Sequence, residues 1–232
     1  MSHINVTMAQ INTKRHWRFA ATRMKNMLES AAKAGATILT LNEISKEQAL
    51  YIKKTPGWDI AWTINDHLPK GGWGGNAVAW KRSEWEMKNS WASAVSIDYR
   101  PGTLRNGFGR PIKKTINQAC VSLRNKHNDF PLKVMAFHFP TEFNDASNSR
   151  ERARDKASAF AKVQIRRGVN VILGGDGNNI FPKAKGLQMA DRDGPDATFS
   201  SGKVVGKKVL KFKRKLQSDH NGLLAVLRFD LD

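Results

Sequence analysis

The sequence has a single cysteine, two tyrosines and no apolar run approaching the roughly 18 residues that a membrane helix needs. One cysteine excludes an internal disulfide framework. Because Cys120 lies in the apolar alternation of residues 116–123, we expect a buried, unreactive thiol. The first eight residues lack the basic stretch and apolar run of a secretory signal. These absences predict a cytoplasmic protein without membrane association.

Acidic residues are scarce as well. Asp and Glu number 20 against 39 Lys and Arg, which gives a formal net charge of +19. Solubility alone requires a charge of magnitude about 2–8 in a small domain. A surface tuned for solubility is one explanation of the excess. A polyanionic partner explains it better, and nucleic acid is favoured over an anionic membrane surface.

The apolar content is sufficient for a folded core. The chain has 232 residues, of which 40% are hydrophobic, including seven Trp and eleven Phe. This length fits one large domain or two small ones. Because no repeat or low-complexity linker divides the chain, we expect a single domain over residues 1–232.

Hydrophobic periodicity predicts alternating strands and helices. Residues 17–31, 45–53 and 145–167 read as helices, with Gly35 and Gly168 as stops of the first and third. A further short helix is expected near 183–190. Strands are predicted at 4–11, 36–41, 58–64, 76–80, 87–97, 114–123, 132–137, 169–175, 196–200, 203–212 and 222–229. This order favours an α/β protein with two sheets packed face to face and helices outside.

Chemically capable side chains stand at the ends of several predicted strands. They are Asn12, Glu43, His138, the pair Asp176 and Asn178, and the pair Asp219 and His220 before the last strand. Ligands of layered α/β folds gather where strand ends converge, so these groups are expected to meet in one cleft.

Each of these residues also has an ordinary explanation. Asn12 could be a turn residue, Glu43 a helix cap and His138 a satisfied, partly buried histidine. Asp176 and Asn178 could form an Asx turn, and Asp219 with His220 a loop ion pair. These explanations weaken together, since five independent turns would all have to end in this set of residue types.

The same segments, taken in order, resemble a known superfamily. They are I11-N12, L41-N42-E43, H138-F139-P140, G175-D176-G177-N178 and S218-D219-H220. In this order they are similar to the motifs of the endonuclease/exonuclease/phosphatase superfamily, which has the deoxyribonuclease-I-like fold. The resemblance spans nearly the whole chain. It implies a four-layer α/β/β/α sandwich and hydrolysis of phosphate esters with a divalent metal.

A looser element and two departures accompany this resemblance. The segment 196–201 is similar to the family strand whose aspartate orients the last histidine, which makes Asp196 the expected partner of His220, with Asp191 and Asp193 as competitors. Asn42 stands where the family has glutamine. The glutamate that pairs with the family's counterpart of His138 has no clear equivalent in residues 70–80.

The resemblance also implies roles. Glu43 and Asp219 are expected to bind Mg²⁺ or Mn²⁺ directly, with Asn12 and Asp176 completing the shell or holding its waters. Asp176 would also orient and deprotonate the attacking water, and Asn178 would bind a phosphoryl oxygen. His220, positioned by Asp196, and His138 are expected to contact the phosphate or share the proton transfers. In-line attack would leave 5′-phosphate and 3′-hydroxyl ends.

Two basic stretches bear on the substrate. Residues 203–215 carry seven basic side chains between apolar ones, so alternation predicts an apolar inner face and an outer row of ammonium groups for a phosphate backbone. A solvated edge strand protected by lysines is the alternative. Residues 100–114 form a second basic segment. Trp73, in a glycine-rich stretch, could stack on a base or sugar, and a plain flexible hairpin is the alternative for this stretch. The expected contacts are Trp73, Arg110, Lys113, Lys114, Lys207, Lys208, Lys211 and Lys213.

The leading hypothesis is a monomeric, metal-dependent deoxyribonuclease that acts on double-stranded DNA. An endonuclease with little sequence preference is favoured, and a repair-type nuclease is a variant of it. A phosphatase or phosphodiesterase for lipid or small phosphate esters is disfavoured by the charge of +19. A binding domain without catalysis is disfavoured because binding needs none of the strand-end residues. A compact, very basic nuclease would suit a phage or a bacterium.

Overall fold

Two six-stranded sheets form the centre of the protein. The computed structural model describes residues 2–13, 20–63, 74–99, 112–140, 148–212 and 220–231, without the side chains of 96–99 and 112–114. All structural statements below refer to these residues.

The first sheet has the strand order β11-β12-β1-β2-β4-β3. Its strands are β11 (Lys203–Leu210), β12 (Gly222–Asp230), β1 (His3–Asn12), β2 (Ile38–Ile44), β4 (Gly75–Lys81) and β3 (Trp58–Thr63). The second sheet has the order β5-β6-β7-β8-β10-β9. It comprises β5 (Trp85–Tyr99), β6 (Ile112–Asn125), β7 (Pro131–His138), β8 (Asn170–Asp176), β10 (Asp196–Ser200) and β9 (Gln188–Asp193).

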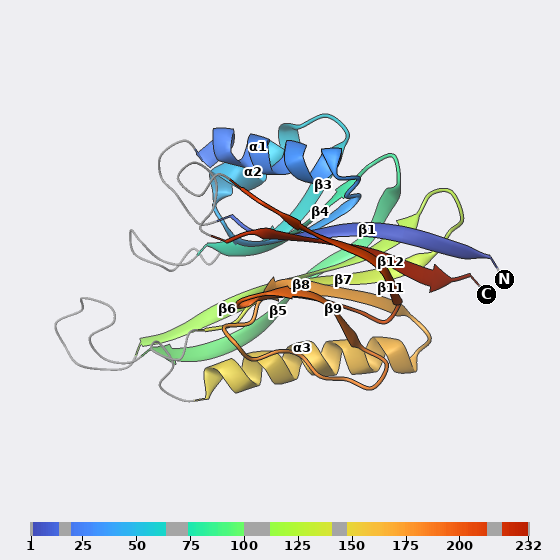
Figure 1. Ribbon diagram of the computed structural model, residues 1–232. Coiled ribbons are helices and arrows are strands. Elements are labelled where there is room, and N and C mark those ends of the chain that lie inside the picture. The colour runs from blue at the N-terminus through green and yellow to red at the C-terminus, as the bar shows by residue number, and fades with distance from the viewer. Residues whose placement is uncertain are drawn as a thin grey trace.

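The helices lie on the two outer faces of the sheet pair (Figure 1). The helices α1 (Ala20–Lys33) and α2 (Lys46–Lys54) cover the first sheet, and α3 (Ser149–Arg166) covers the second. Ser45 caps α2, because its side chain accepts the Gln48 backbone N–H while the Gln48 side chain accepts the Ser45 backbone N–H. The capping role that Glu43 could have had therefore belongs to Ser45.

Three apolar cores separate the layers. One packs α1 and α2 on the first sheet through residues such as Met24, Leu28 and Leu39. A second fills the space between the sheets, and a third packs α3 on the second sheet through its buried alanines. Helix, sheet, sheet and helix therefore follow one another, as the predicted four-layer α/β/β/α sandwich requires.

Strand direction brings several carboxyl ends to one end of this sandwich. β1 runs parallel to β2, and β7 runs parallel to β8. The chain termini lie together at the opposite end, where His3 is paired with Asp230 (Figure 1). Side chains that follow these parallel strands are therefore close in space.

Most of the predicted elements are present, but the short helix near 183–190 is wrong. Gln188–Asp193 instead forms β9, which pairs with β10 as an edge strand. Gly186 precedes it with a φ of +83°, a conformation that ends local helical geometry. The strand conformation of this segment depends on its pairing with β10, and the local periodicity of the sequence does not reveal that pairing.

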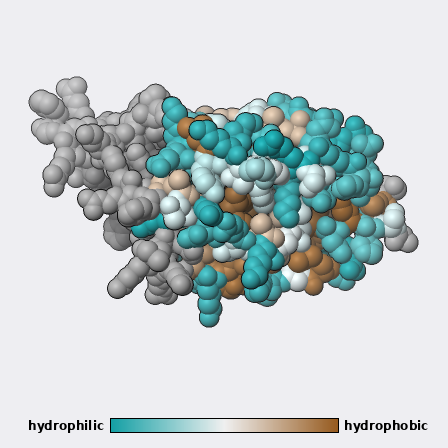
Figure 2. Space-filling model, turned by 90° about the horizontal axis from the view of Figure 1, so that it is seen from above, coloured by the Kyte–Doolittle hydropathy of each residue, from teal (hydrophilic) through white to brown (hydrophobic). Residues whose placement is uncertain are grey.

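Hydrophilic residues cover most of the described surface over α1 and α2, and hydrophobic ones show only in small areas (Figure 2). None of the helices in the described ranges combines the length and apolarity needed to traverse a membrane.

Candidate active site

The inner faces of four strands change from apolar to polar over a distance of four residues. In the parallel pair β1 and β2, Met8 faces Ile38, and Asn12 is the partner of Asn42 at the strand ends. In β7 and β8 the pairing passes from Val134 with Ile172 to His138 with Asp176. Because side chains alternate between faces, all these residues point into the space between the sheets. The polar ends of the four strands therefore converge.

Glu43 reaches this space through an irregularity in β2. The register of β2 and β4 shifts between Leu41 and Ile44, and Glu43 adopts a φ of +53°. This left-handed conformation is unfavourable for a residue with a side chain, and such strain is typical of functional sites. Gly74 passes so close that an added Cβ would lie 2.2 Å from the Glu43 carbonyl carbon, so only glycine fits there.

The first group of candidate ligands consists of Glu43, His138 and Asp176, whose donor atoms lie within 4.8 Å of one another. Asn12 is buried between them, with its Nδ2 3.2 Å from Glu43 Oε1 and 3.5 Å from Asp176 Oδ2. His138 Nε2 lies 3.8 Å from Asp176 Oδ2. Asn12 is therefore a bridge between the two carboxylates rather than a simple turn residue.

The second group consists of Asp176, Asp196 and His220. Asp196 is buried directly opposite Asp176 in the pairing of β10 with β8. His220 Nδ1–H donates to Asp196 Oδ2 at 2.5 Å. The competitor Asp193 instead accepts Asn221 Nδ2 at 2.7 Å, which anchors the residue next to His220. Among the acids considered for His220, the geometry thus selects Asp196.

The electrostatics of Asp196 reflect its burial. Burial raises the pKa of this carboxyl, and the nearby Asp176 carboxylate raises it further, whereas hydrogen bonds from His220 and Gln10 lower it. The pKa remains above its ordinary value of 3.8. Ionised Asp196 is therefore costly in the folded chain.

Asp176 uses both of its oxygens. Its Oδ1 accepts the backbone N–H of Asn178 at 2.9 Å, which is an Asx turn, and its Oδ2 faces Asn12 and His138. Asn178 has a φ of +46°, and its Nδ2 donates to Phe139 O at 2.6 Å. The Asx turn and the convergence of polar groups therefore coexist, because the turn fixes the carboxylate that faces the site.

The donor set fits a hard divalent cation. Asp176 and Asp196 are buried carboxylates placed opposite one another, and Glu43 adds a third nearby. Like charges opposed across strands destabilise a sheet unless a cation compensates them. Carboxylate and amide oxygens are the ligands that Mg²⁺ and Mn²⁺ prefer.

Several predicted site residues lie outside the described ranges. These are Asp219, Trp73, Arg110 and Lys213. Lys113 and Lys114 belong to β6, but their side chains are not among those described.

The lysines of β11 are arranged differently from the prediction of one outer row. A bulge between Val204 and Gly206 changes which side chains share a face. Lys207 is opposite Ala225 of the inter-sheet core and 4.0 Å from Asp191, whereas Lys208 is opposite Leu224 on the α1 side. The exposed fractions of Val205 and Val209 are 40% and 39%, so these valines do not form the expected buried face. Lys207, Lys208 and Lys211 are nevertheless all exposed at this sheet edge.

The sequence reading missed a set of buried amides behind the site. Asn42 Nδ2 donates to Asn76 Oδ1 at 2.9 Å and to Phe137 O at 2.5 Å, and so connects the two sheets. Asn76 Nδ2 donates to Asn117 O at 2.8 Å. The available signal was Gln10, a polar residue at an inner position of β1 between Met8 and Asn12.

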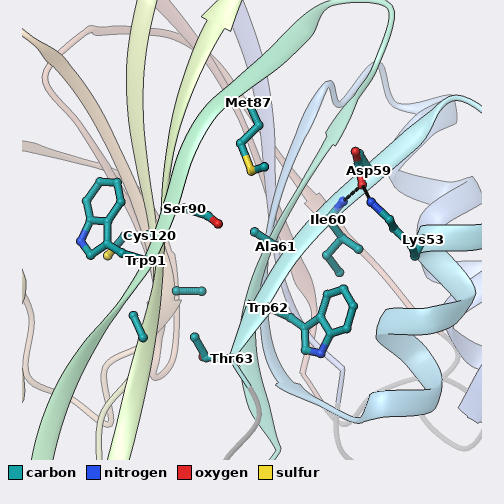
Figure 3. A pocket seen from close by; sticks show the side chains of 12 residues that line it. Lys53, Asp59, Ile60, Ala61, Trp62, Thr63, Met87, Ser90, Trp91 and Cys120 are labelled. Carbon is teal, nitrogen blue, oxygen red and sulfur yellow. Dashed lines mark hydrogen bonds and ion pairs between the residues drawn. The ribbon is translucent and has the colours of Figure 1, made fainter.

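A separate hollow lies along the side of the sandwich, between β3 and β5. It has a volume of about 410 Å³ and contains none of the strand-end residues. Figure 3 shows Ala61 and Ser90 beside the gap between the strands, while the Trp91 ring lies on the other side of β5. There the ring packs against Phe160 of α3 with a centroid distance of 6.1 Å. Small side chains between two sheet edges account for this hollow.

The likeness of this chain to known proteins lies in its structure and not in its sequence. No protein-family model matches the sequence. No curated protein matches it significantly. Among solved structures, an endonuclease/exonuclease/phosphatase family protein from Bacteroides thetaiotaomicron superposes with a TM-score of 0.69 at 15% identity, covering 100% of both chains.

Two TDP2 structures are also similar. TDP2 from C. elegans gives a TM-score of 0.62 at 15% identity and covers 96% of this chain and 75% of its own. TDP2 from D. rerio, in complex with a single-strand DNA product, gives 0.64 at 12% identity, covering 97% and 99%. At these identities the likeness concerns the fold alone. The chain has the fold of the endonuclease/exonuclease/phosphatase superfamily.

Proposed function

We propose that this protein is a metal-dependent nuclease that hydrolyses DNA phosphodiester bonds, as an endonuclease of low sequence specificity. The observation that carries the proposal is the meeting of two groups of candidate ligands at the ends of β2, β7, β8 and β10, with Asp176 common to both. The fold of the solved neighbours supports phosphate ester chemistry.

Glu43, Asp176 and Asn12 are the described residues that would hold the metal, and Asp219 is proposed with them from the sequence motif. A bound Mg²⁺ or Mn²⁺ would neutralise phosphate charge and stabilise the departing alkoxide. The left-handed backbone of Glu43 supports this assignment, since it directs the carboxylate towards Asn12 and Asp176.

The remaining groups would handle protons and phosphate oxygens. Asp176, fixed by the Asn178 backbone N–H, would orient the attacking water and accept its proton. The Asn178 amide would donate to a phosphoryl oxygen through the N–H that Phe139 O does not use. His220, held by Asp196 at Nδ1, would contact the phosphate. His138 would serve as an acid or phosphate donor beside Asp176.

Charge favours nucleic acid as the substrate. The net charge of +19 and the exposed lysines of β11 suit a phosphate backbone. The D. rerio TDP2 structure with its single-strand DNA product supports a nucleic acid at this fold. We propose double-stranded DNA, bound by a monomer through backbone contacts and without base recognition, in the cytoplasm.

A plasmid-nicking assay tests the proposal. Supercoiled plasmid incubated with the protein and Mg²⁺ or Mn²⁺ is expected to become nicked, and EDTA is expected to stop the reaction. DNA ligase should then reseal the nicks directly, because it requires 5′-phosphate and 3′-hydroxyl ends. Asp176→Asn is expected to be inactive. Asp59→Asn, which removes a carboxylate bonded to Lys53 outside the site, is the matched control and should nick normally.

The alternatives give different results in the same assay. Retarded plasmid mobility without nicking would indicate a nucleic-acid-binding protein. Phosphate release from small esters without nicking would indicate a phosphatase. Either result would exclude the proposed nuclease.

The lysine edge has its own test. Replacing Lys207, Lys208 and Lys211 together by Ala should weaken DNA binding. The slope of log affinity against log salt should become shallower by about 0.9 for each phosphate that the variant no longer neutralises. An unchanged slope would remove this strand from the binding surface. The double-stranded and single-stranded forms of one DNA sequence, compared in the same titration, distinguish the two substrate classes.

A further inference from the structure

Gln10 is a buried residue that contacts the site residue Asp196 and lies two positions before Asn12 on β1. It occupies the inner face of β1 between Met8 and Asn12, and its exposed fraction is 0%. Its Nε2 donates to Asn42 Oδ1 at 3.0 Å and to Asp196 Oδ1 at 2.9 Å. Gln10 therefore joins a residue of the first sheet to the carboxylate that holds His220 in the second.

The orientation of the Gln10 amide is fixed by its neighbours. Asn42 uses its own Nδ2 for Asn76 and Phe137, so its oxygen is the atom presented to Gln10. Asp196 also presents an oxygen. A reversed Gln10 amide would bring its Oε1 against two acceptors, which is unfavourable. Anchored Asn42 thus dictates where the Gln10 donors point.

Stability alone does not account for glutamine at this position. Gln10 Oε1 is buried and has no hydrogen-bond partner within the described structure. A buried acceptor without a partner is destabilising, and an apolar residue of similar size avoids that penalty. The inner face of β1 already holds Val6 and Met8, so methionine would continue its pattern. The donation to Asp196 is what an apolar residue cannot supply.

We propose that Gln10 is a positioning residue that acts through Asp196 on His220. Gln10 holds one oxygen of the Asp196 carboxylate, and the other oxygen accepts His220 Nδ1–H. With both oxygens engaged, the plane of the carboxylate is fixed, and the direction in which His220 presents Nε2 is fixed with it. The catalytic part of this inference rests on the proposed nuclease function.

The kinetic test compares Gln10→Met with Thr198→Val. Thr198 is equally buried on the inner face of β10, two residues from Asp196, and its hydroxyl has no partner among the described residues. Outer-shell partners of site residues typically contribute about 10–100-fold to activity. We expect Gln10→Met to lower kcat by about that factor with little change in KM, and Thr198→Val to retain wild-type kcat. A Gln10→Met kcat within twofold of wild type would overturn the proposal.

A double-mutant cycle separates positioning from a general structural role. If Gln10 acts through Asp196, the double variant Gln10→Met/Asp196→Ala should be no slower than Asp196→Ala alone. Multiplied losses would overturn the proposal. Melting temperatures verify that each variant is folded, and Gln10→Leu replaces Gln10→Met in the cycle if the latter unfolds.

A second readout does not depend on activity. NMR of the imidazole nitrogens of His220, labelled with ¹⁵N and measured without metal or DNA, reports its hydrogen bond to Asp196. Gln10→Met should shift these signals, whereas Thr198→Val should leave them in place. Unchanged signals in Gln10→Met would overturn the positioning role even if the protein shows no nuclease activity. Shifted signals without nuclease activity would leave the positioning intact and refute the proposed function alone.

Discussion

The two ends of the inter-sheet space differ although the same strands form both. Towards the middle, Met8, Ile38 and Ile172 belong to a continuous apolar core. Four residues further along β1, β2 and β8 stand Asn12, Asn42 and Asp176, which are all buried. Asn12 contacts Asp176, and Asn42 donates a hydrogen bond to Asn76. Apolar burial stabilises a fold, whereas buried polar groups are costly unless satisfied. Stability and chemistry are thus separated along the strand axis, which makes them separately testable.

The largest effect is expected at the polar end. Asp176→Asn and Glu43→Gln should each lower the nicking rate by roughly 10²–10⁴-fold, because each removes a carboxylate assigned to metal or proton transfer. Both should unfold in urea at a midpoint no lower than wild type, since each relieves repulsion between nearby carboxylates. Activity within tenfold of wild type would break the comparison at this end.

At the apolar end we expect the opposite result, namely a loss of stability without a loss of nicking activity. Ile172→Ala is expected to lower the free energy of unfolding by about 2–5 kcal/mol, because it removes buried methyl groups and leaves a cavity. The nicking rate per folded molecule should change little, since Ile172 belongs to the apolar core and to neither ligand group. Urea titration and nicking assays on the same preparation measure both quantities. A selective loss of nicking with normal stability would contradict the separation.

A smaller effect concerns the stability contribution of Asp196. Its folded-state pKa is raised by burial and by Asp176, so its ionised form is disfavoured in the folded protein. As pH rises from below 3.8 through the raised folded value, the wild type should lose stability relative to Asp196→Asn. Urea unfolding in EDTA at several pH values measures this difference. The opposite trend, with wild type gaining on the variant as pH rises, would show that ionised Asp196 is stabilising.

The smallest effect is expected from chemical modification of Cys120, which lies in the apolar core between the second sheet and α3. Burial raises the pKa of its thiol to about 12, so the reactive thiolate is scarce at neutral pH. Ellman's reagent should react negligibly with the native protein and with one thiol after unfolding in urea. Treatment of the native protein should leave nicking unchanged. Rapid native labelling would show that the core around α3 opens easily.

The regular alternation of side chains made the polar end of the strands predictable from the sequence. Residues placed by a departure from alternation could not be predicted in this way. Asn12, His138 and Asp176 follow regular strands, so their meeting could be foreseen. Glu43 enters the site through a bulge and a positive φ, which local propensity does not encode. The bulge in β11 similarly changes which side chains before and after it share a face. Lys207 and Lys208 lie on opposite faces because they are consecutive residues of the strand.

Residues that act through long-range partners were the hardest to predict. Gln10 and Asp196 are separated by 186 positions in the chain, and only the packing of the two sheets brings them together. The edge strand β9 was misjudged for the same reason, since its conformation depends on pairing with β10. Motif order nevertheless led to the four-layer fold.

The strict pairing of β7 with β8 limits how this site can change by insertion or deletion. Adding one residue to β8 between Ile172 and Asp176 would reverse the face of every following side chain. Asp176 would then point towards α3, and Gly175 would take its place opposite His138. Adding two residues would restore the face but would move Asp176 about 6.6 Å along the strand, away from its partner His138. The length of this strand is therefore fixed by the site, whereas substitutions can accumulate one at a time.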